Sequence, residues 1–397
     1  MTPLNNMALG ASADYVRRAN YLPALVERLD LCQAETHRFM LVAHLFDDTM
    51  RMIDALAGIM DFDAIIGIPY SSGSDATRTK WQSRYGSIVH CPKTEDDFKE
   101  TLAAAIQKSF LQCRSSGQKL VIQEVGGYVV ELLHERFADQ LDLVEGVVEI
   151  TKQGVWRAEQ LNLKVPVLHC ADSELKRLEA KRCGETIVRC LDGLSRDLGN
   201  SLAGRHAAVF GAGWIGSGVA HAFRRLDVIP MVIDTDPLKV AEARLSGLQA
   251  HMSPRDLDKC DLIVGAAGRL SITEHVLRQL RNGCMVASAS SRRIEIDVDY
   301  LETAPSADIH ASIRAFHFQN DIGHGERQIC LVNDGYPANF IPGSGSVADE
   351  IVELILGELI VLMSDITFYP YEPGIHRITP ASEALCTQLW IEQRDQL

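Results

Sequence analysis

A glycine-rich turn between two apolar runs constrains the fold of this chain more than any other feature. Residues 204–236 read GRHAAVFGAGWIGSGVAHAFRRLDVIPMVIDTD, an order typical of strand, turn, helix and strand. The turn contains the pattern GxGxxG, formed by Gly211, Gly213 and Gly216. In this context the first glycine permits a tight turn, the second lets a pyrophosphate approach the helix N-terminus, and the third allows close helix–strand packing. The stretch predicts a Rossmann unit that binds a dinucleotide.

The second apolar run ends at an acid that bears on the choice of dinucleotide. Asp234 follows Gly216 by 18 residues and closes the second predicted strand. A carboxylate at this place accepts both ribose hydroxyls of adenosine and repels a 2′-phosphate, so NAD is favoured over NADP. Trp214 and Ile215, at the start of the helix, are expected to contact the cofactor as well. The alternative is a glycine turn in a flavodoxin-like domain that binds no dinucleotide.

Charge and composition favour a small-molecule partner. The formal net charge is −14 and no basic run is present, which argues against nucleic acid or an anionic membrane as the main partner. The ten cysteines show no CxxC pairing, as expected of reduced thiols in a cytoplasmic protein, and no metal site is predicted. The longest apolar candidate, 351–363, is interrupted by Glu353, Gly357 and Glu358, and predicts a half-buried helix rather than a membrane span.

The N-terminal part of the chain alternates between strand and helix patterns. Alternation of this kind predicts a parallel sheet with helices on both faces. The predicted strands are 39–44, 64–69, 87–90, 120–122 and 143–150, and the predicted helices are 13–31, 47–60, 95–115, 129–137 and one from about 75. Ligands of such sheets bind where the strands end. The residues expected at that edge are His44, Ser71, Ser72, Glu124 and Thr151.

A long helical pattern over 173–200, with Ser173 as its N-cap, leads into the glycine-turn unit and suggests a hinge. Further strands at 262–266, 285–289, 309–311 and 329–333 complete a second parallel sheet, and helices are predicted at 273–280, 347–364 and 380–392. The predicted fold class is therefore α/β, with two doubly wound parallel-sheet domains joined by hinge helices. The expected domains are a substrate domain at 1–188, a Rossmann NAD-binding domain at 189–343, and C-terminal helices at 344–397 that return to the substrate domain.

Several motifs, read together, resemble those of the S-adenosylhomocysteine hydrolase family. They are the glycine turn followed by IDTDP, and the segments 163–184 (LKVPVLHCADSELKRLEAKRCG), 293–298 (RIEIDV), 334–339 (DGYPAN) and 372–378 (EPGIHRI). The resemblance implies bound NAD, a cytoplasmic homotetramer or homodimer, and a reaction in which a ribose hydroxyl is transiently oxidised. It also implies a cofactor contact at Asn339 and catalytic roles for Lys176 and His44.

At other positions the chain departs from the family pattern. Positions where the family carries polar groups around adenosine hold Phe46, Val125, Ile150, Ala180, Lys181, Ser291 and Ser346. The C-terminal tail that carries lysine and tyrosine in the family is absent. Because several hydrogen-bonding groups are lost while the cofactor positions survive, the resemblance implies a changed substrate.

The function predicted from these features is NAD-dependent, oxidoreductase-type hydride transfer on a small polar molecule. The candidate acid–base residues are Lys176, His44 and Glu124, and a cation such as Lys181 beside Lys176 would lower its pKa. Without the family's tail, NAD is expected to exchange as a cosubstrate. Two alternatives remain open: an authentic adenosylhomocysteinase in which Glu124 and Glu149 replace the missing acids, and an NAD-binding regulatory pseudoenzyme. A cavity filled by Phe46 and Ile150 would favour the pseudoenzyme.

Overall fold

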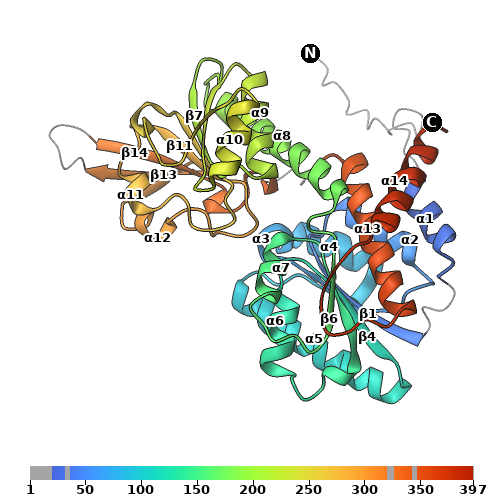
Figure 1. The fold of residues 1–397 in the computed structure, drawn as a ribbon. Coiled ribbons are helices and arrows are strands. Elements are labelled where there is room, and N and C mark those ends of the chain that lie inside the picture. The colour runs from blue at the N-terminus through green and yellow to red at the C-terminus, as the bar shows by residue number, and fades with distance from the viewer. Residues whose placement is uncertain (1–19, 32–35, 320–325, 342–346, 397) are drawn as a thin grey trace, which may run out of the picture.

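Two α/β lobes, each built around one sheet, make up the molecule (Figure 1). The computed structural model describes residues 20–31, 36–319, 326–341 and 347–396. The long helix α8 (Glu174–Asp197) runs between the lobes, and the side chain of Ser173 caps its N-terminus by accepting from Lys176 N. The predicted long helix and its Ser173 cap are confirmed, while its role as a hinge stays a prediction. The domain limits proposed from the sequence stay a prediction.

The first lobe contains a seven-stranded sheet in the order β15-β6-β5-β4-β1-β2-β3, and every pairing in it is parallel. Its strands are β1 (His37–Ala43), β2 (Phe62–Gly67), β3 (Val89–His90), β4 (Lys119–Glu124), β5 (Val144–Glu149), β6 (Pro166–His169) and β15 (Gly374–Arg377). Its helices are α1 (Tyr21–Leu29), α2 (Asp47–Leu56), α3 (Pro69–Ser72), α4 (Asp75–Tyr85), α5 (Glu95–Ser116), α6 (Tyr128–Arg136) and α7 (Lys152–Ala158). The parallel sheet predicted from alternation is confirmed.

Three short elements of this lobe were not predicted. Strands β6 and β15 have four residues each, and α7 has seven. Runs this short carry too few apolar positions to show a period. The short helix α3 follows β2 directly, and it begins with Pro69, whose fixed φ suits the first position of a helix.

The second lobe contains an eight-stranded sheet in the order β12-β13-β14-β11-β10-β7-β8-β9. Its strands are β7 (His206–Phe210), β8 (Ile229–Ile233), β9 (Gln249–His251), β10 (Leu262–Gly265), β11 (Cys284–Ser288), β12 (Ser306–His310), β13 (Ile313–Gln319) and β14 (Glu326–Val332), and its helices are α9 (Trp214–Arg225), α10 (Pro237–Leu245), α11 (Glu274–Leu277) and α12 (Val298–Leu301). From β9 to β14 the strands are parallel and follow the order 3-2-1-4-5-6 of dinucleotide-binding sheets.

The edge of the second sheet differs from the prediction. The strand expected at 309–311 is the end of β12, which pairs antiparallel with β13, and β13 pairs antiparallel with β14. Only two residues separate β12 from β13, so the chain must fold back as a hairpin, because a parallel crossover needs a dozen or more residues. The parallel core that carries the glycine turn is unaffected.

The C-terminal segment returns to the first lobe, where α13 (Asp349–Phe368) and α14 (Pro380–Arg394) pack beside α1 (Figure 1). Helix α13 is more deeply buried than the sequence suggested, since every residue from Val352 to Ser364 is buried. It packs against α1, α2, α8 and the sheet at once. Because α13 is covered on several sides, its two glutamates, Glu353 and Glu358, are buried together with the apolar residues.

Helix α8 is held against the second lobe by close backbone contact with α9. A Cβ atom built on Gly184 would lie 2.5 Å from the amide nitrogen of Val219, and one on Gly218 would lie 2.6 Å from the carbonyl oxygen of Lys181. Such separations are below any van der Waals contact, so both positions require glycine for this packing. The helix that bears Lys176 is thereby fixed to the helix that follows the glycine turn.

Candidate functional site

A cavity of about 960 Å³ lies between the two lobes and is lined by residues of both. The glycine turn and the residues after β8, β10 and β11 form one end, and residues after β1, β4 and β5 together with α8 and α13 form the other. Both sheets therefore present the carboxyl ends of their strands to the same space, where α/β proteins bind ligands. The first end is called the cofactor end below, and the second the substrate end.

The glycine turn has the geometry that a dinucleotide requires. Gly211 has a φ of 107°, and a Cβ there would lie 2.5 Å from the carbonyl oxygen of Ala266. A Cβ on Gly216 would lie 2.0 Å from the carbonyl oxygen of Gly211, whereas one on Gly213 would meet no atom of the described residues within 4 Å. The turn is thus tight beneath the helix and open on the side that faces the cavity. This is the cradle that a pyrophosphate at the N-terminus of α9 needs.

Asp234 lies at the end of β8 and lines the cavity beside the turn. Its Oδ2 accepts from the amide of Ala212 at 2.7 Å, and its Oδ1 accepts from the amide of Asp236 at 2.9 Å. These bonds hold the carboxylate at the cavity wall, where it can accept ribose hydroxyls. Trp214, Ile215 and Asn339 also line the cavity, while Gly216 packs beneath the turn. The residues present fit NAD.

Lys176 lines the substrate end and forms an ion pair that sequence reasoning missed. Its Nζ lies 2.9 Å from Oε2 of Glu179, three residues later on the same face of α8. Burial alone would lower the pKa of the Lys176 ammonium, but the charge and hydrogen bond of Glu179 outweigh it and raise the pKa. The expectation that Lys181 lowers this pKa is wrong, because Lys181 is exposed and does not line the cavity. The i,i+3 spacing of Lys176 and Glu179 within the predicted helix could have indicated this ion pair.

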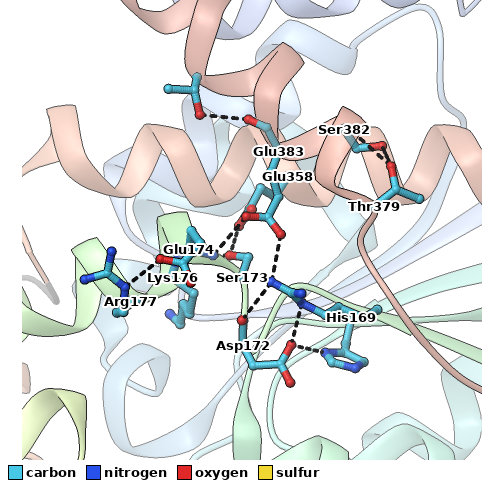
Figure 2. A network of polar contacts seen from close by, with 12 residues as sticks. His169, Asp172, Ser173, Glu174, Lys176, Arg177, Glu358, Thr379, Ser382 and Glu383 are labelled. Carbon is cyan, nitrogen blue, oxygen red and sulfur yellow. Dashed lines mark hydrogen bonds and ion pairs between the residues drawn. The ribbon is translucent and has the colours of Figure 1, made fainter.

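The C-terminal segment holds the start of α8 in place, as Figure 2 shows. Ser173 Oγ donates to Oε2 of Glu358 at 2.8 Å, and Oε2 of Glu383 accepts from the amide of Glu174 at 2.9 Å. Arg377 joins this network through Glu383 at 2.9 Å and Asp172 at 3.1 Å. Burial raises the pKa of Glu358 to about 8, so its carboxyl group is largely protonated at neutral pH. The position of Lys176 therefore depends on residues about two hundred positions further along the chain.

His44 lies at the end of β1 and also lines the substrate end. Its Nδ1 is 2.7 Å from Ser71 Oγ, and its ring stacks on Phe340, with ring centroids 4.7 Å apart. Burial, together with the positive charge of Lys176, lowers the pKa of His44 to about 4. At neutral pH the cavity thus holds a neutral imidazole and an ammonium group, which can act as a base and an acid.

The structure does not place Glu124 in the cavity. Its carboxylate accepts from the amides of Val129 at 2.7 Å and Val130 at 3.0 Å, at the first turn of α6. Glu149 accepts from the amides of Gly126 and Gly127 and from Thr151. Burial raises the pKa of both carboxyl groups, and the charge of Glu149 raises that of Glu124 further. Both acids are engaged in holding the backbone after β4 and β5.

Gln123 is a second residue that sequence reasoning missed. It lines the cavity, is 1% exposed, and donates from Nε2 to the carbonyl oxygen of Glu124 at 2.8 Å. This bond fixes the orientation of the amide, and Oε1 is left buried without a donor among the residues that the structure describes. A buried acceptor without a partner is costly, so a ligand group that donates to it would be bound specifically. No sequence pattern marks this amide.

The rest of the substrate end is mostly apolar. Its wall includes Phe46, Met52, Val125, Ile150, Ile355, Leu356, Leu359 and Phe340. Phe46 and Ile150 both line the cavity, whose volume of about 960 Å³ extends over both ends. Gly345 and Ser346, which stand where the resemblance has a glycine and a histidine, lie outside the described residues.

Across 20–31, 36–319, 326–341 and 347–396, no group of three or more His, Cys, Asp or Glu side chains could hold a metal ion. No helix in that same part of the chain is long and apolar enough to cross a membrane.

Comparison with known proteins gives one family model and a set of similar sequences. Residues 183–342 match the model of the S-adenosyl-L-homocysteine hydrolase NAD-binding domain. An S-inosyl-L-homocysteine hydrolase of Methanopyrus kandleri is 28% identical over 281 residues, which cover 68% of this chain and 65% of that protein. An adenosylhomocysteinase of Sulfolobus acidocaldarius is 24% identical over 347 residues, covering 84% and 79%. The match thus spans slightly less than two thirds of the first relative.

Among solved structures, a dipicolinate synthase polypeptide of Bacillus halodurans resembles this chain with a TM-score of 0.46 and 15% identity. The likeness covers 83% of this chain and 99% of that one. A similarity at this level carries no argument about the reaction.

Proposed function

Because this chain is a divergent member of the S-adenosyl-L-homocysteine hydrolase family, with that family's NAD-binding domain, we propose that it is an oxidoreductase acting on a substrate other than S-adenosylhomocysteine. The proposed reaction interconverts a secondary alcohol and a ketone. NAD, when bound at the glycine turn, supplies the hydride acceptor or donor. The observation that carries the proposal is the placement of Lys176, Glu179 and His44 at one end of a cavity whose other end fits NAD.

The acid–base groups at the substrate end have complementary protonation states. The neutral imidazole of His44 can accept the hydroxyl proton of the alcohol, and Ser71 orients the ring through Nδ1. The Lys176 ammonium, kept protonated by Glu179, stabilises the negative charge that develops on the substrate oxygen. In the reverse direction the protonated His44 returns the proton to that oxygen. Both side chains line the cavity, so they can reach one bound substrate.

The residues that line the substrate end favour a less polar substrate than the small polar molecule expected from the sequence. Apolar and aromatic side chains dominate this end, and Gln123 offers a buried acceptor. A substrate that fits would bury a flat or apolar part, donate a hydrogen bond to Gln123 and present its hydroxyl group to His44. The relatives named for S-inosyl- and S-adenosylhomocysteine make these two nucleosides the first compounds to test.

The two alternatives have less support. An authentic adenosylhomocysteinase with rearranged acids needs Glu124 and Glu149 in the cavity, but their carboxylates bond to the backbone. A regulatory pseudoenzyme is disfavoured by the open cavity and by the pairing of Lys176 with Glu179. A homotetramer or homodimer remains a proposal, which light scattering after size-exclusion chromatography would test.

The proposal is tested with purified protein, NAD, S-adenosylhomocysteine, S-inosylhomocysteine and a panel of secondary alcohols with aromatic or heterocyclic groups. NADH is followed by absorbance, and released nucleoside by chromatography. We expect NADH to accumulate with an alcohol, without nucleoside release, because the proposed reaction is a net oxidation with NAD as a cosubstrate. Release of adenosine or inosine without NADH accumulation would instead identify a hydrolase. Binding of NAD with no reaction across the panel would support the regulatory alternative.

A further inference from the structure

Ser71 and Ser72 connect His44 to the backbone of the first lobe. Ser71 Oγ lies 2.7 Å from Nδ1 of His44 and 3.1 Å from Ser72 Oγ. Ser71 Oγ is also 3.2 Å from the carbonyl oxygen of Ile68, and Ser72 Oγ accepts from the amide of Leu45 at 2.9 Å. Ser72 is fully buried, and neither serine is among the described residues that line the cavity. The two hydroxyl groups can therefore act on a ligand only through His44.

The short helix α3 places both serines beside the end of β1. The amide of Ile68 donates to the carbonyl oxygen of Ala43 at 3.1 Å, so α3 begins next to the residue that precedes His44. A Cβ built on Gly67 would lie 2.7 Å from Cβ of Ser72, which is closer than two carbon atoms approach without a bond. The glycine at the end of β2 thus permits Ser72 to pack at this place.

The four side-chain contacts of these serines share only two hydroxyl protons. Ser72 Oγ accepts from the amide of Leu45, and Ser71 Oγ is its only acceptor among the described residues, so its proton goes to Ser71. If Ser71 then donates to Ile68, its oxygen can accept both from Ser72 and from the imidazole Nδ1, and all four bonds form. If Ser71 donates to Nδ1 instead, the bond to Ile68 is lost. The arrangement that forms every bond requires a proton on Nδ1.

Aromatic side chains hold the imidazole of His44 in this orientation. The centroid of its ring lies 4.7 Å from that of Phe340, 5.5 Å from that of Tyr70 and 6.0 Å from that of Phe46. Contacts with three rings oppose a half-turn of the imidazole, which would carry Nδ1 away from Ser71. Burial lowers the pKa of His44 to about 4, so at pH 7 the ring is neutral and carries one proton. With that proton on Nδ1, Nε2 has a free lone pair.

We propose that Ser71 is a positioning residue that holds His44 in the tautomer with its proton on Nδ1, so that Nε2 is the atom that takes the hydroxyl proton of the substrate. Proton transfer then breaks the O–H bond of the alcohol, leaves its electron pair on the substrate oxygen and forms Nε2–H. Nδ1 keeps its bond to Ser71 throughout, and Ser72 supports this arrangement by donating to Ser71. The role of Nε2 as the base rests on the proposed function, whereas the place of the proton in the free protein does not.

The test locates the proton by nuclear magnetic resonance at pH 7, on protein labelled with nitrogen-15 in its histidines. Correlation of the ring nitrogens with the carbon-bound ring protons distinguishes the two tautomers, and the signals of His44 are those absent from His44→Gln. We expect the wild type to carry the proton on Nδ1. In Ser71→Ala the proton should move largely to Nε2, because Nδ1–H would be buried without an acceptor whereas His44 adjoins the cavity. Ser109→Ala is the matched control, since Ser109 is buried in α5 of the same lobe and its hydroxyl group has no partner among the described residues.

Kinetics with the alcohol identified by the activity test distinguish positioning from folding. Ser71→Ala should lower kcat by about tenfold or more, and Ser71→Thr should recover most of this loss because it keeps the hydroxyl group. A wild-type His44 with its proton on Nε2, or a folded Ser71→Ala variant with an unchanged tautomer, overturns the proposal. So does a kcat of Ser71→Ala equal to that of the Ser109→Ala control. A proton on Nδ1 in a protein that transfers no hydride would leave the tautomer standing and reject the proposed function.

Discussion

The two ends of the cavity differ in which part of the chain forms them. The cofactor end depends on backbone geometry: Gly211 and Gly216 admit no Cβ, and Gly213 leaves the wall open. The substrate end depends on individual side chains, and its acidic residue is not one of those that the sequence suggested. Glu179 pairs with Lys176, while Glu124 and Glu149 hold backbone amides. Backbone requirements survive large sequence change, whereas a few substitutions alter what a pocket of side chains can bind.

The largest effect should come from removing the ammonium group at the substrate end. Lys176→Met is expected to lower kcat by about 10²- to 10³-fold, because the negative charge on the substrate oxygen is no longer stabilised. Calorimetric binding of NAD should be unchanged, since Lys176 belongs to the opposite end of the cavity from the glycine turn. Lys181→Met is the matched control and should retain activity. A Lys176→Met enzyme as active as the control would contradict the division between the two ends.

The neutral state of His44 predicts a dependence of stability on pH. Its folded-state pKa of about 4 is below the ordinary value of 6.5, so the unfolded chain takes up this proton first as pH falls. The free energy of unfolding should therefore decrease from about pH 6.5 to about pH 4, by up to about 3 kcal/mol. Denaturant titrations across this range should show a smaller decrease in His44→Gln. Identical pH profiles for the two proteins would show that His44 is not held neutral.

At the cofactor end, substitutions of two glycines distinguish the effect of backbone packing on stability from the effect of cofactor contact on NAD binding. Gly216→Ala places a Cβ 2.0 Å from a backbone oxygen, and the unfolding free energy should fall by about 1–3 kcal/mol, with loss of NAD binding. Gly213→Ala meets no atom of the described chain within 4 Å, so thermal stability should be kept while NAD affinity falls. Thermal denaturation and NAD titration of both variants check this. Unimpaired NAD binding by Gly213→Ala would place the pyrophosphate elsewhere.

The smallest effect on kcat is expected at Glu124. Because burial raises its pKa from 4.5 to about 8, the folded protein releases this proton at higher pH than the unfolded chain, and wild-type stability should fall as pH rises from about 4.5 to about 8. Glu124→Gln turns an NH2 group toward one of the two backbone amides that Glu124 accepts from, so the free energy of unfolding should fall by about 1–3 kcal/mol. The variant should also flatten this pH-dependent decrease and leave kcat unchanged. Stability and kcat are measured on the same preparations. A large loss of kcat in a stable Glu124→Gln protein would restore this acid to the catalytic set.

The prediction from sequence was most successful where spacing reflects regular geometry. The parallel sheets, the hinge helix with its Ser173 cap and the glycine turn followed from apolar periodicity and glycine spacing. The short strands β6 and β15 and the helix α7 were missed because they are too short to show a period. The hairpin β12–β13 was missed because an edge strand carries little apolar signal, and β12 is mostly exposed.

The substrate end shows that residue spacing in the sequence does not predict the partners and protonation states of side chains. Lys176 and His44 were predicted to act together and both line the cavity, but the state of each depends on neighbours that the fold supplies. Glu124 looked like a replacement acid because it lies beside a position where the family has one. Its orientation was decided by the amides of α6, which compete for the carboxylate.

By itself, the sequence determined the two α/β sheets, the NAD-binding turn and the helix that carries Lys176. These depend on local conformation and on the burial of periodic apolar residues, and short stretches of sequence determine both. Only the tertiary structure decided that Glu179 pairs with Lys176, that Gln123 turns its amide toward the carbonyl of Glu124, and that Ser71 contacts Nδ1 of His44. Hydrogen bonds and charge pairs act over a few ångströms, so the partners of these side chains were settled only when distant segments packed together.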